Sequence, residues 1–190
     1  CYSVTLSIGI AMNNSEANSL DDLLKAADTA MYEAKQRGRN NYRFFAEDMQ
    51  KRSEKKHRIQ VMLQKSIEQN ELFITYQPKI SIFNRRIVGC EALLRWQTRS
   101  GENISPALFV PIAEQSGIIN KVGKWVIEEA CKQTRKWNKY PNFDDFTVSI
   151  NVSTKQLIHR GFSDFVEQLI GNGDDMTRIF SVRNKLKWRY

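Results

Sequence analysis

Residues 72–80, LFITYQPKI, and residues 87–96, IVGCEALLRW, decide the fold of this chain. Both stretches are rich in β-branched and aromatic residues, and the side chains of the first alternate between the two faces expected of a strand. The link between them, around residues 84–86, is too short to contain a crossover helix. The sequence therefore predicts two antiparallel strands that form a hairpin.

The residues after the hairpin predict helices and a further strand. Ser105-Pro106 and Val110-Pro111 are both signals for a helix start, and Gly117 is a typical C-terminal cap. We expect a longer helix over 119–139, a strand over 146–153 and a last helix near 162–170. Strand, helix and strand in this order predict a parallel α/β arrangement.

The residues before the hairpin predict a second, smaller group of elements. Residues 4–11, VTLSIGIA, are typical of a strand, a helix is expected between Ser19 and Gly38, and residues 41–45 are typical of a short strand. Residues 46–69 are charged, contain neither Gly nor Pro, and carry a narrow apolar stripe. That pattern indicates a helix connecting two domains, so we expect a domain boundary here.

Three predicted strands each carry polar residues on one face, because side chains repeat every two residues. The shared faces are Thr75, Gln77 and Lys79; Glu91, Leu93 and Arg95; and Ser149, Asn151 and Ser153. The Glu91 carboxylate and the Asn151 side-chain carbonyl are hard oxygen donors that suit a divalent cation, and Arg95 suits a phosphate. Two other interpretations stay open at this point: Glu91 pairs with Arg95, or the polar face is simply hydrated.

The charge and the cysteines limit the classes of function. The net charge is +8, but ten Lys and Arg fall between Lys35 and Lys65 and four more in the last ten residues. A solvated connecting helix and a basic tail account for this distribution; a region that attracts phosphate ligands is the alternative. Three cysteines without close spacing and two histidines indicate neither a disulfide framework nor a zinc site. No apolar run is long enough to span a bilayer.

Four motifs carry a family resemblance: Tyr76-Gln77-Pro78, GCEALLRW at 89–96, SPALFVPIAEQSGII at 105–119 and VSINVSTKQL at 148–157. In this order they resemble the EAL domain family of cyclic di-GMP phosphodiesterases. The resemblance implies a modified (βα)₈ barrel whose first strand runs against the second. It implies hydrolysis of cyclic di-GMP to linear pGpG with two divalent cations, usually Mg²⁺ or Mn²⁺. It further implies that Glu91 and Asn151 are metal ligands and that Gln77, Leu93 and Arg95 line the substrate site.

Residues 4–11 and ADTAMYEAKQRGRNNY at 27–42 resemble the end of a GGDEF diguanylate cyclase domain, which has an α+β, nucleotide-cyclase-like fold. Lys35 and Arg39 match positions that contact the nucleotide triphosphate in that family, although both are also ordinary cations at a helix end. The fold class expected is thus α/β. The expected domains are a C-terminal part of a GGDEF domain (1–46), a helical linker (47–69), an N-terminal part of an EAL domain (70–180) and an atypical basic tail (181–190).

Much of the family's catalytic equipment has no counterpart in this sequence. A (βα)₈ barrel needs about 250 residues, and after residues 178–180 the sequence reads SVRNKLKWRY where the family has a third metal carboxylate. Asp144-Asp145 and Asp174-Asp175 are misplaced for the family's aspartate pair. We therefore expect a truncated chain that is poorly stable and inactive by itself. The alternative functions are a non-catalytic cyclic di-GMP-sensing or protein-interaction module, a basic nucleic-acid binder, or no function of its own.

The expected partners follow from the same resemblance. We expect cyclic di-GMP as the ligand, a homodimer through the EAL domain or the linker helix, and no nucleic acid. A membrane would be reached only through segments upstream of the sequence. The expected location is the cytoplasm, with a parent protein that could be anchored to the inner membrane.

Overall fold

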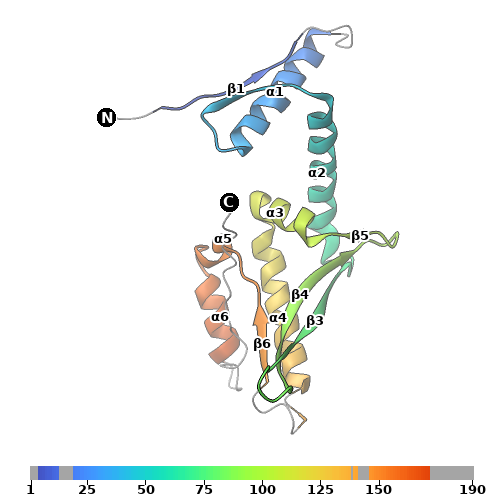
Figure 1. Ribbon diagram of the computed structural model, residues 1–190, viewed down its shortest axis with the longest axis vertical. Coiled ribbons are helices and arrows are strands. Elements are labelled where there is room, and N and C mark those ends of the chain that lie inside the picture. The colour runs from blue at the N-terminus through green and yellow to red at the C-terminus, as the bar shows by residue number, and fades with distance from the viewer. Residues whose placement is uncertain (1–3, 13–18, 138, 141–145, 172–190) are drawn as a thin grey trace. The chain divides into compact units, whose positions relative to one another are not determined.

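The computed structural model describes residues 4–12, 19–137, 139–140 and 146–171 (Figure 1). It forms two compact units, 1–59 and 60–190, and the division falls within the predicted linker helix. The elements in chain order are β1 (Ser7–Ile10), α1 (Leu20–Gln36), β2 (Asn41–Phe44), α2 (Glu47–Ser66), β3 (Leu72–Ile80), β4 (Ile87–Gln97), β5 (Asn103–Ile104), α3 (Pro106–Ser116), α4 (Ile119–Trp137), β6 (Thr147–Ile150), α5 (Thr154–Leu157) and α6 (Phe162–Gly171).

The first unit is a strand–helix–strand motif, as predicted. β1 pairs in parallel with β2, from Ser7 opposite Asn41 to Ile10 opposite Phe44. The helix α1 between them begins at the N-cap Ser19, whose hydroxyl accepts a hydrogen bond of 3.2 Å from the Asp22 amide. At Gly9 the backbone of β1 touches this helix, because an added Cβ would lie 1.9 Å from the Ala27 carbonyl oxygen.

The second unit is built on the predicted hairpin. β3 pairs antiparallel with β4, from Leu72 opposite Trp96 to Ile80 opposite Ile87, which confirms the hairpin. β6 pairs in parallel with β4, which confirms the parallel arrangement. The short strand β5 pairs with the end of β4. The longest strand, β4, therefore lies between β3 and β6, and its side chains neighbour those of both strands.

One face of this sheet is covered by helices. The side chains of Cys90, Ala92 and Trp96, at alternate positions of β4, are all buried. α3 and α4 pack against β4 and β6, and the Trp96 and Phe109 rings meet edge to face with their centroids 5.4 Å apart. Burial of this apolar face leaves the intervening side chains of β4 on the opposite face.

α3 corrects one prediction. Pro106 does begin the helix and Gly117, with φ 78°, does end it, but Pro111 lies inside the helix rather than at the start of a second one. A proline in a helix loses one hydrogen bond. Here Phe109, Ile112 and Ala113 on both sides of it are buried, so packing of the apolar helix face outweighs that loss.

The segment after β6 also differs from the prediction. The expected strand over 146–153 covers only Thr147–Ile150, and the unpredicted short helix α5 begins at Thr154. Ser153 is the N-cap of α5, so it belongs to a turn and not to the polar face of a strand.

Some predictions lie outside the described residues. They concern Asp144-Asp145, Asp174-Asp175, residues 178–180 and the basic tail 181–190. Within the described ranges, no helix combines the length and the apolar character needed to cross a membrane.

Candidate functional site

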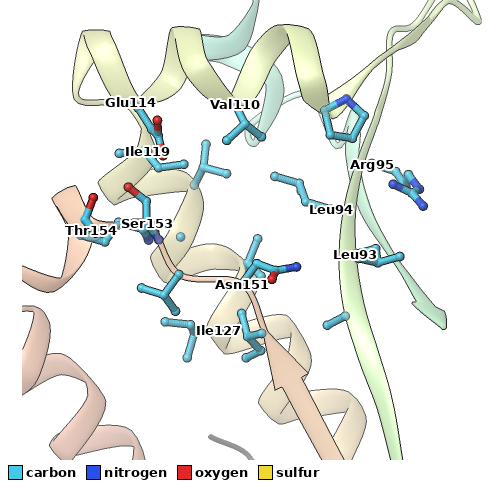
Figure 2. A pocket seen from close by; sticks show the side chains of 18 residues that line it. Leu93, Leu94, Arg95, Val110, Glu114, Ile119, Ile127, Asn151, Ser153 and Thr154 are labelled. Carbon is cyan, nitrogen blue, oxygen red and sulfur yellow. Dashed lines mark hydrogen bonds between the residues drawn. The ribbon is translucent and has the colours of Figure 1, made fainter. Parts of the chain in front are cut away.

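Polar side chains of three strands meet in one row across the sheet. The strand registers place Gln77 of β3 opposite Glu91 of β4, and Glu91 opposite Ser149 of β6. Figure 2 shows Leu93 and Arg95 on the other side of β4 from Leu94. Glu91, Leu93 and Arg95 therefore share the face that α3 and α4 do not cover, as their spacing predicted.

Glu91 and Asn151 are in direct contact. Asn151 is the first residue after β6, and its side-chain Nδ2 donates a hydrogen bond of 2.7 Å to Glu91 Oε1. Asn151 is exposed and Glu91 is half-buried, so an ion from solvent can reach both. Rotation of the Asn151 amide would turn its carbonyl oxygen toward the same point as the carboxylate. Two hard oxygen donors at this spacing fit a divalent cation.

Lys79 adds a positive charge to the same face. Its ammonium group hydrogen-bonds the Ser149 hydroxyl, which is buried. Because Lys79 is on β3 and Ser149 on β6, the lysine side chain must cross β4, and the residue opposite Lys79 there is Gly89, which has no side chain. Along the polar face, Lys79 thus lies one residue pair from Glu91, and the uncharged Leu93 separates Glu91 from Arg95.

The alternative pairing of Glu91 with Arg95 does not occur among the described residues. The Cα atoms of residues four apart on a strand are about 13 Å apart, so an ion pair would require both side chains to extend fully toward each other. Within the described ranges, Gln77 and Arg95 also make no side-chain hydrogen bond to another residue. Both side chains are thus available to a ligand on this face.

The described residues hold no cluster of three or more His, Cys, Asp or Glu that could bind a metal. The Glu91 carboxylate and the Asn151 amide can therefore supply two metal ligands. Further ligands would have to be water, substrate or groups beyond the described ranges. The residues present fit one edge of a metal site.

The neighbouring thiol and phenol have no part in this chemistry. Burial raises the pKa of Cys90 to about 11, and burial also raises the pKa of Tyr76 to about 12. The Tyr76 ring packs edge to face on Trp137, with the centroids 4.8 Å apart. Both side chains stay protonated at neutral pH and belong to the covered face of the sheet.

A cavity of about 320 Å³ lies behind β4, between α3, α4 and the turn after β6, and its lining includes Leu93, Arg95 and Asn151. Leu94 and Val110 point into it, while the Arg95 side chain points away (Figure 2). Its lining is mostly aliphatic, so we assign no nucleotide to it.

Lys35 and Arg39 lie in the other unit. Lys35 is in the last turn of α1, and Arg39 follows that helix in a turn with φ 57°. Both are exposed.

Two features of the site differ from the expectation drawn from the sequence. Lys79 was assigned to the polar face but not to the site, and only its contact with Ser149 reveals its position. The helix α5 was not predicted either, although Ser153 and Gln156 have the spacing of a capping box, which was the available signal.

Comparison with known proteins decides the family. Residues 60–182 match the EAL domain, and residues 2–41 match the diguanylate cyclase GGDEF domain. The chain belongs to the EAL domain family. The expected fold is confirmed at this level: part of an EAL-type modified barrel, with a GGDEF fragment before it.

Relatives of this EAL chain include the bifunctional diguanylate cyclase/cyclic di-GMP phosphodiesterase MucR of Pseudomonas aeruginosa. It is 36% identical over 167 residues, which are 88% of this chain and 24% of MucR. The cyclic di-GMP phosphodiesterase PdeR of Escherichia coli is 33% identical over 164 residues, which are 86% of this chain and 24% of PdeR. The chain thus spans about a quarter of the length of each.

Solved structures agree. The PaMucR phosphodiesterase in complex with c-di-GMP aligns with a TM-score of 0.60 and 32% identity, covering 64% of this chain and 49% of that one. The EAL enzyme Bd1971, bound to cAMP and cyclic-di-GMP, aligns with a TM-score of 0.62 and 28% identity, covering 87% and 43%. EAL phosphodiesterases are a metal-dependent family.

Proposed function

We propose that the EAL unit of this chain binds cyclic di-GMP together with Mg²⁺ or Mn²⁺. In the complete protein it would form part of the site that hydrolyses one phosphodiester bond of the dinucleotide to give linear pGpG. The observation that carries the proposal is the 2.7 Å contact between Glu91 and Asn151, which come from two neighbouring strands.

Glu91 and Asn151 are the proposed ligands of the cation. The Glu91 carboxylate supplies the charge, and Asn151 supplies its Oδ1 once the amide has turned away from its hydrogen bond. A cation bound there would polarise a phosphoryl oxygen and lower the pKa of a bound water molecule. The half-buried setting of Glu91 strengthens its attraction for the ion relative to a fully solvated carboxylate.

Gln77, Leu93 and Arg95 are the proposed substrate contacts. The Arg95 guanidinium can hold a phosphate through two parallel hydrogen bonds, which fixes its orientation as well as its position. Gln77 lies directly opposite Glu91 and can donate to a substrate oxygen beside the cation. Leu93, between Glu91 and Arg95, offers an apolar surface to the dinucleotide. In the other unit, we propose that Lys35 and Arg39 are remnants of the cyclase's nucleotide contacts.

By itself, the 190-residue chain is proposed to bind without turnover. In-line displacement with two metals needs ligands on both sides of the attacking water, and the described residues offer one carboxylate and one amide at the site. An enzyme would hydrolyse the bound dinucleotide, whereas a cyclic di-GMP sensor would only bind it. Binding without hydrolysis by the chain alone is expected under the proposal.

Calorimetry and product analysis test these statements together. Cyclic di-GMP would be titrated into the chain with Mn²⁺ present, and pGpG would be followed by chromatography. We expect binding that Glu91→Ala and Asn151→Ala each weaken strongly. Thr134→Val is the control, because it removes a polar group from α4, outside the proposed site. Binding that neither site variant alters would refute the proposal, whereas hydrolysis abolished by Glu91→Ala would refute only the lack of turnover.

Location and assembly complete the proposal. Cys90 and Cys131 are free and buried, which suits a reducing cytoplasm. A homodimer through the EAL unit or α2 is proposed, together with the absence of nucleic-acid binding. Analytical ultracentrifugation and a salt-dependent DNA-binding assay test the two statements.

A further inference from the structure

The turn that carries Asn151 is closed by a capping box. Three residues, 151–153, connect β6 to α5. The Ser153 amide donates a hydrogen bond of 3.0 Å to Gln156 Oε1, and the Lys155 amide donates one of 3.2 Å to the Ser153 hydroxyl. These two bonds fix the backbone immediately after Asn151 by reciprocal pairing of side chains and amides.

The carboxamide of Gln156 rests on a glycine of a different helix. Gln156 is only 3% exposed. A Cβ added to Gly123, in the interior of α4, would lie 1.7 Å from Gln156 Nε2 and 2.8 Å from its Cδ. Any larger residue at position 123 would therefore displace Gln156. A glycine inside a helix lowers helix stability, so this contact is a reason for its presence.

The neighbours of Asn151 are anchored, while Asn151 is exposed. Ile150 and Val152 are 3% and 6% exposed, and Ile150 is paired with Ala92 of β4. With both flanking side chains in the core, the direction of the Asn151 side chain follows from the backbone of the turn. That direction brings its amide to Glu91.

We infer that Gln156 and Gly123 are positioning residues for Asn151: they hold the turn after β6 so that the Asn151 side chain meets Glu91. Neither residue touches the proposed cation. The effect of these residues on metal binding rests on the proposed function. The dependence of the Asn151–Glu91 contact on Gln156 does not.

Removal of the Gln156 carboxamide would leave the part-buried Ser153 amide without its acceptor and loosen the start of α5. Asn151 would then sample directions away from Glu91, and the cation would lose one of two protein ligands. Changes in residues that orient metal ligands typically weaken metal binding about 10- to 100-fold. Gln156→Glu keeps an acceptor oxygen at this position, because glutamate is the other residue found at the third helical position of capping boxes.

The test uses the full chain and Mn²⁺ alone as the probe, titrated by calorimetry or electron paramagnetic resonance. We expect Gln156→Ala and Gly123→Ala to weaken Mn²⁺ binding about 10- to 100-fold. Gln156→Glu should recover most of this loss, and the control Thr134→Val should bind as the parent chain does. Mn²⁺ affinity equal to the parent in folded Gln156→Ala and Gly123→Ala would overturn the inference.

A second measurement needs no metal and keeps the two proposals apart. Amide exchange should show the Ser153 amide protected in the parent chain, and NMR should show the Asn151 side-chain amide shifted by its bond to Glu91 and released in Gln156→Ala. A parent chain that binds no Mn²⁺ but shows these signals refutes the proposed function alone. A Ser153 amide that exchanges like a free loop refutes the positioning role, even where Gln156→Ala does not fold.

Discussion

Asn151 donates a 2.7 Å hydrogen bond to Glu91 across the boundary between β6 and β4, although 60 residues separate the two in the chain. The parallel pairing of the strands, with Glu91 opposite Ser149, makes this contact possible. The two residues thus form a hydrogen bond in the metal-free protein, and their oxygen atoms could serve as ligands of a divalent cation.

An Asn151→Asp variant should turn this contact into a metal-dependent one. Two carboxylates at hydrogen-bond distance repel each other in the absence of a cation. We therefore expect a lower melting temperature than the parent chain in EDTA and a larger rise on addition of Mn²⁺. Thermal unfolding with and without Mn²⁺ measures both. An equal Mn²⁺ effect on variant and parent would mean that the cation binds elsewhere.

Lys79→Met should raise the affinity for Mn²⁺. Lys79 places an ammonium group on the polar face one level from Glu91, where it opposes a second positive charge. Partial screening by solvent suggests a gain of about two- to fivefold, or roughly 0.5–1 kcal/mol. Lys132→Met, at an exposed position in α4, is the control that changes net charge equally. A weaker affinity in Lys79→Met would indicate that the lysine mainly supports the sheet.

Glu71→Ala should destabilise the second unit. Glu71 is 8% exposed, and its carboxylate accepts hydrogen bonds from Trp96 Nε1 and the Arg99 amide, each 3.0 Å long. Leaving the buried Trp96 Nε1 and the part-buried Arg99 amide without an acceptor is expected to cost about 1–3 kcal/mol in the free energy of unfolding.

Urea unfolding measures that loss, with Glu68→Ala as the control. Glu68 is an exposed acid three residues away that pairs with Lys121 at the surface, and its removal should change stability little. Equal effects of the two variants would show that burial of Glu71 is unimportant.

Stability should fall as the pH rises from 9 to 12. In the folded chain, burial raises the pKa of Cys90 from 9.0 to about 11 and that of Tyr76 from 10.0 to about 12. The unfolded chain therefore releases these protons first, and the contribution of both groups to stability, complete below pH 9, is lost through this range. Urea unfolding at several pH values should show a smaller fall in Tyr76→Phe. A profile identical to the parent would contradict the assignment to Tyr76.

Much of the sheet could be predicted because its determinants are local. The alternation in residues 72–80 and the short link before Ile87 were sufficient for the hairpin, and parity alone placed Glu91 and Arg95 on one face. The first unit followed likewise from a capped helix between two β-rich stretches. These signals depend on a few neighbouring residues, and the structure contains the strands and the helix that they predict.

The remaining features depend on contacts between distant residues. Pro111 is tolerated inside α3 because the surrounding face of that helix is buried, which a local proline rule cannot show. The contact of Lys79 with Ser149 requires an empty position at Gly89 on the strand between them. Likewise, Gln156 of α5 packs against Gly123 of α4, and only the fold brings these two helices together. Packing decided each of these cases.

The location of bound Mn²⁺ in crystals of the chain, determined from its anomalous scattering, tests the central claim most directly. The account predicts a peak roughly 2.0–2.6 Å from both a Glu91 carboxylate oxygen and Asn151 Oδ1, with the direct hydrogen bond between the two side chains broken. A peak at any other place, with the Asn151 amide still bonded to Glu91, would contradict it.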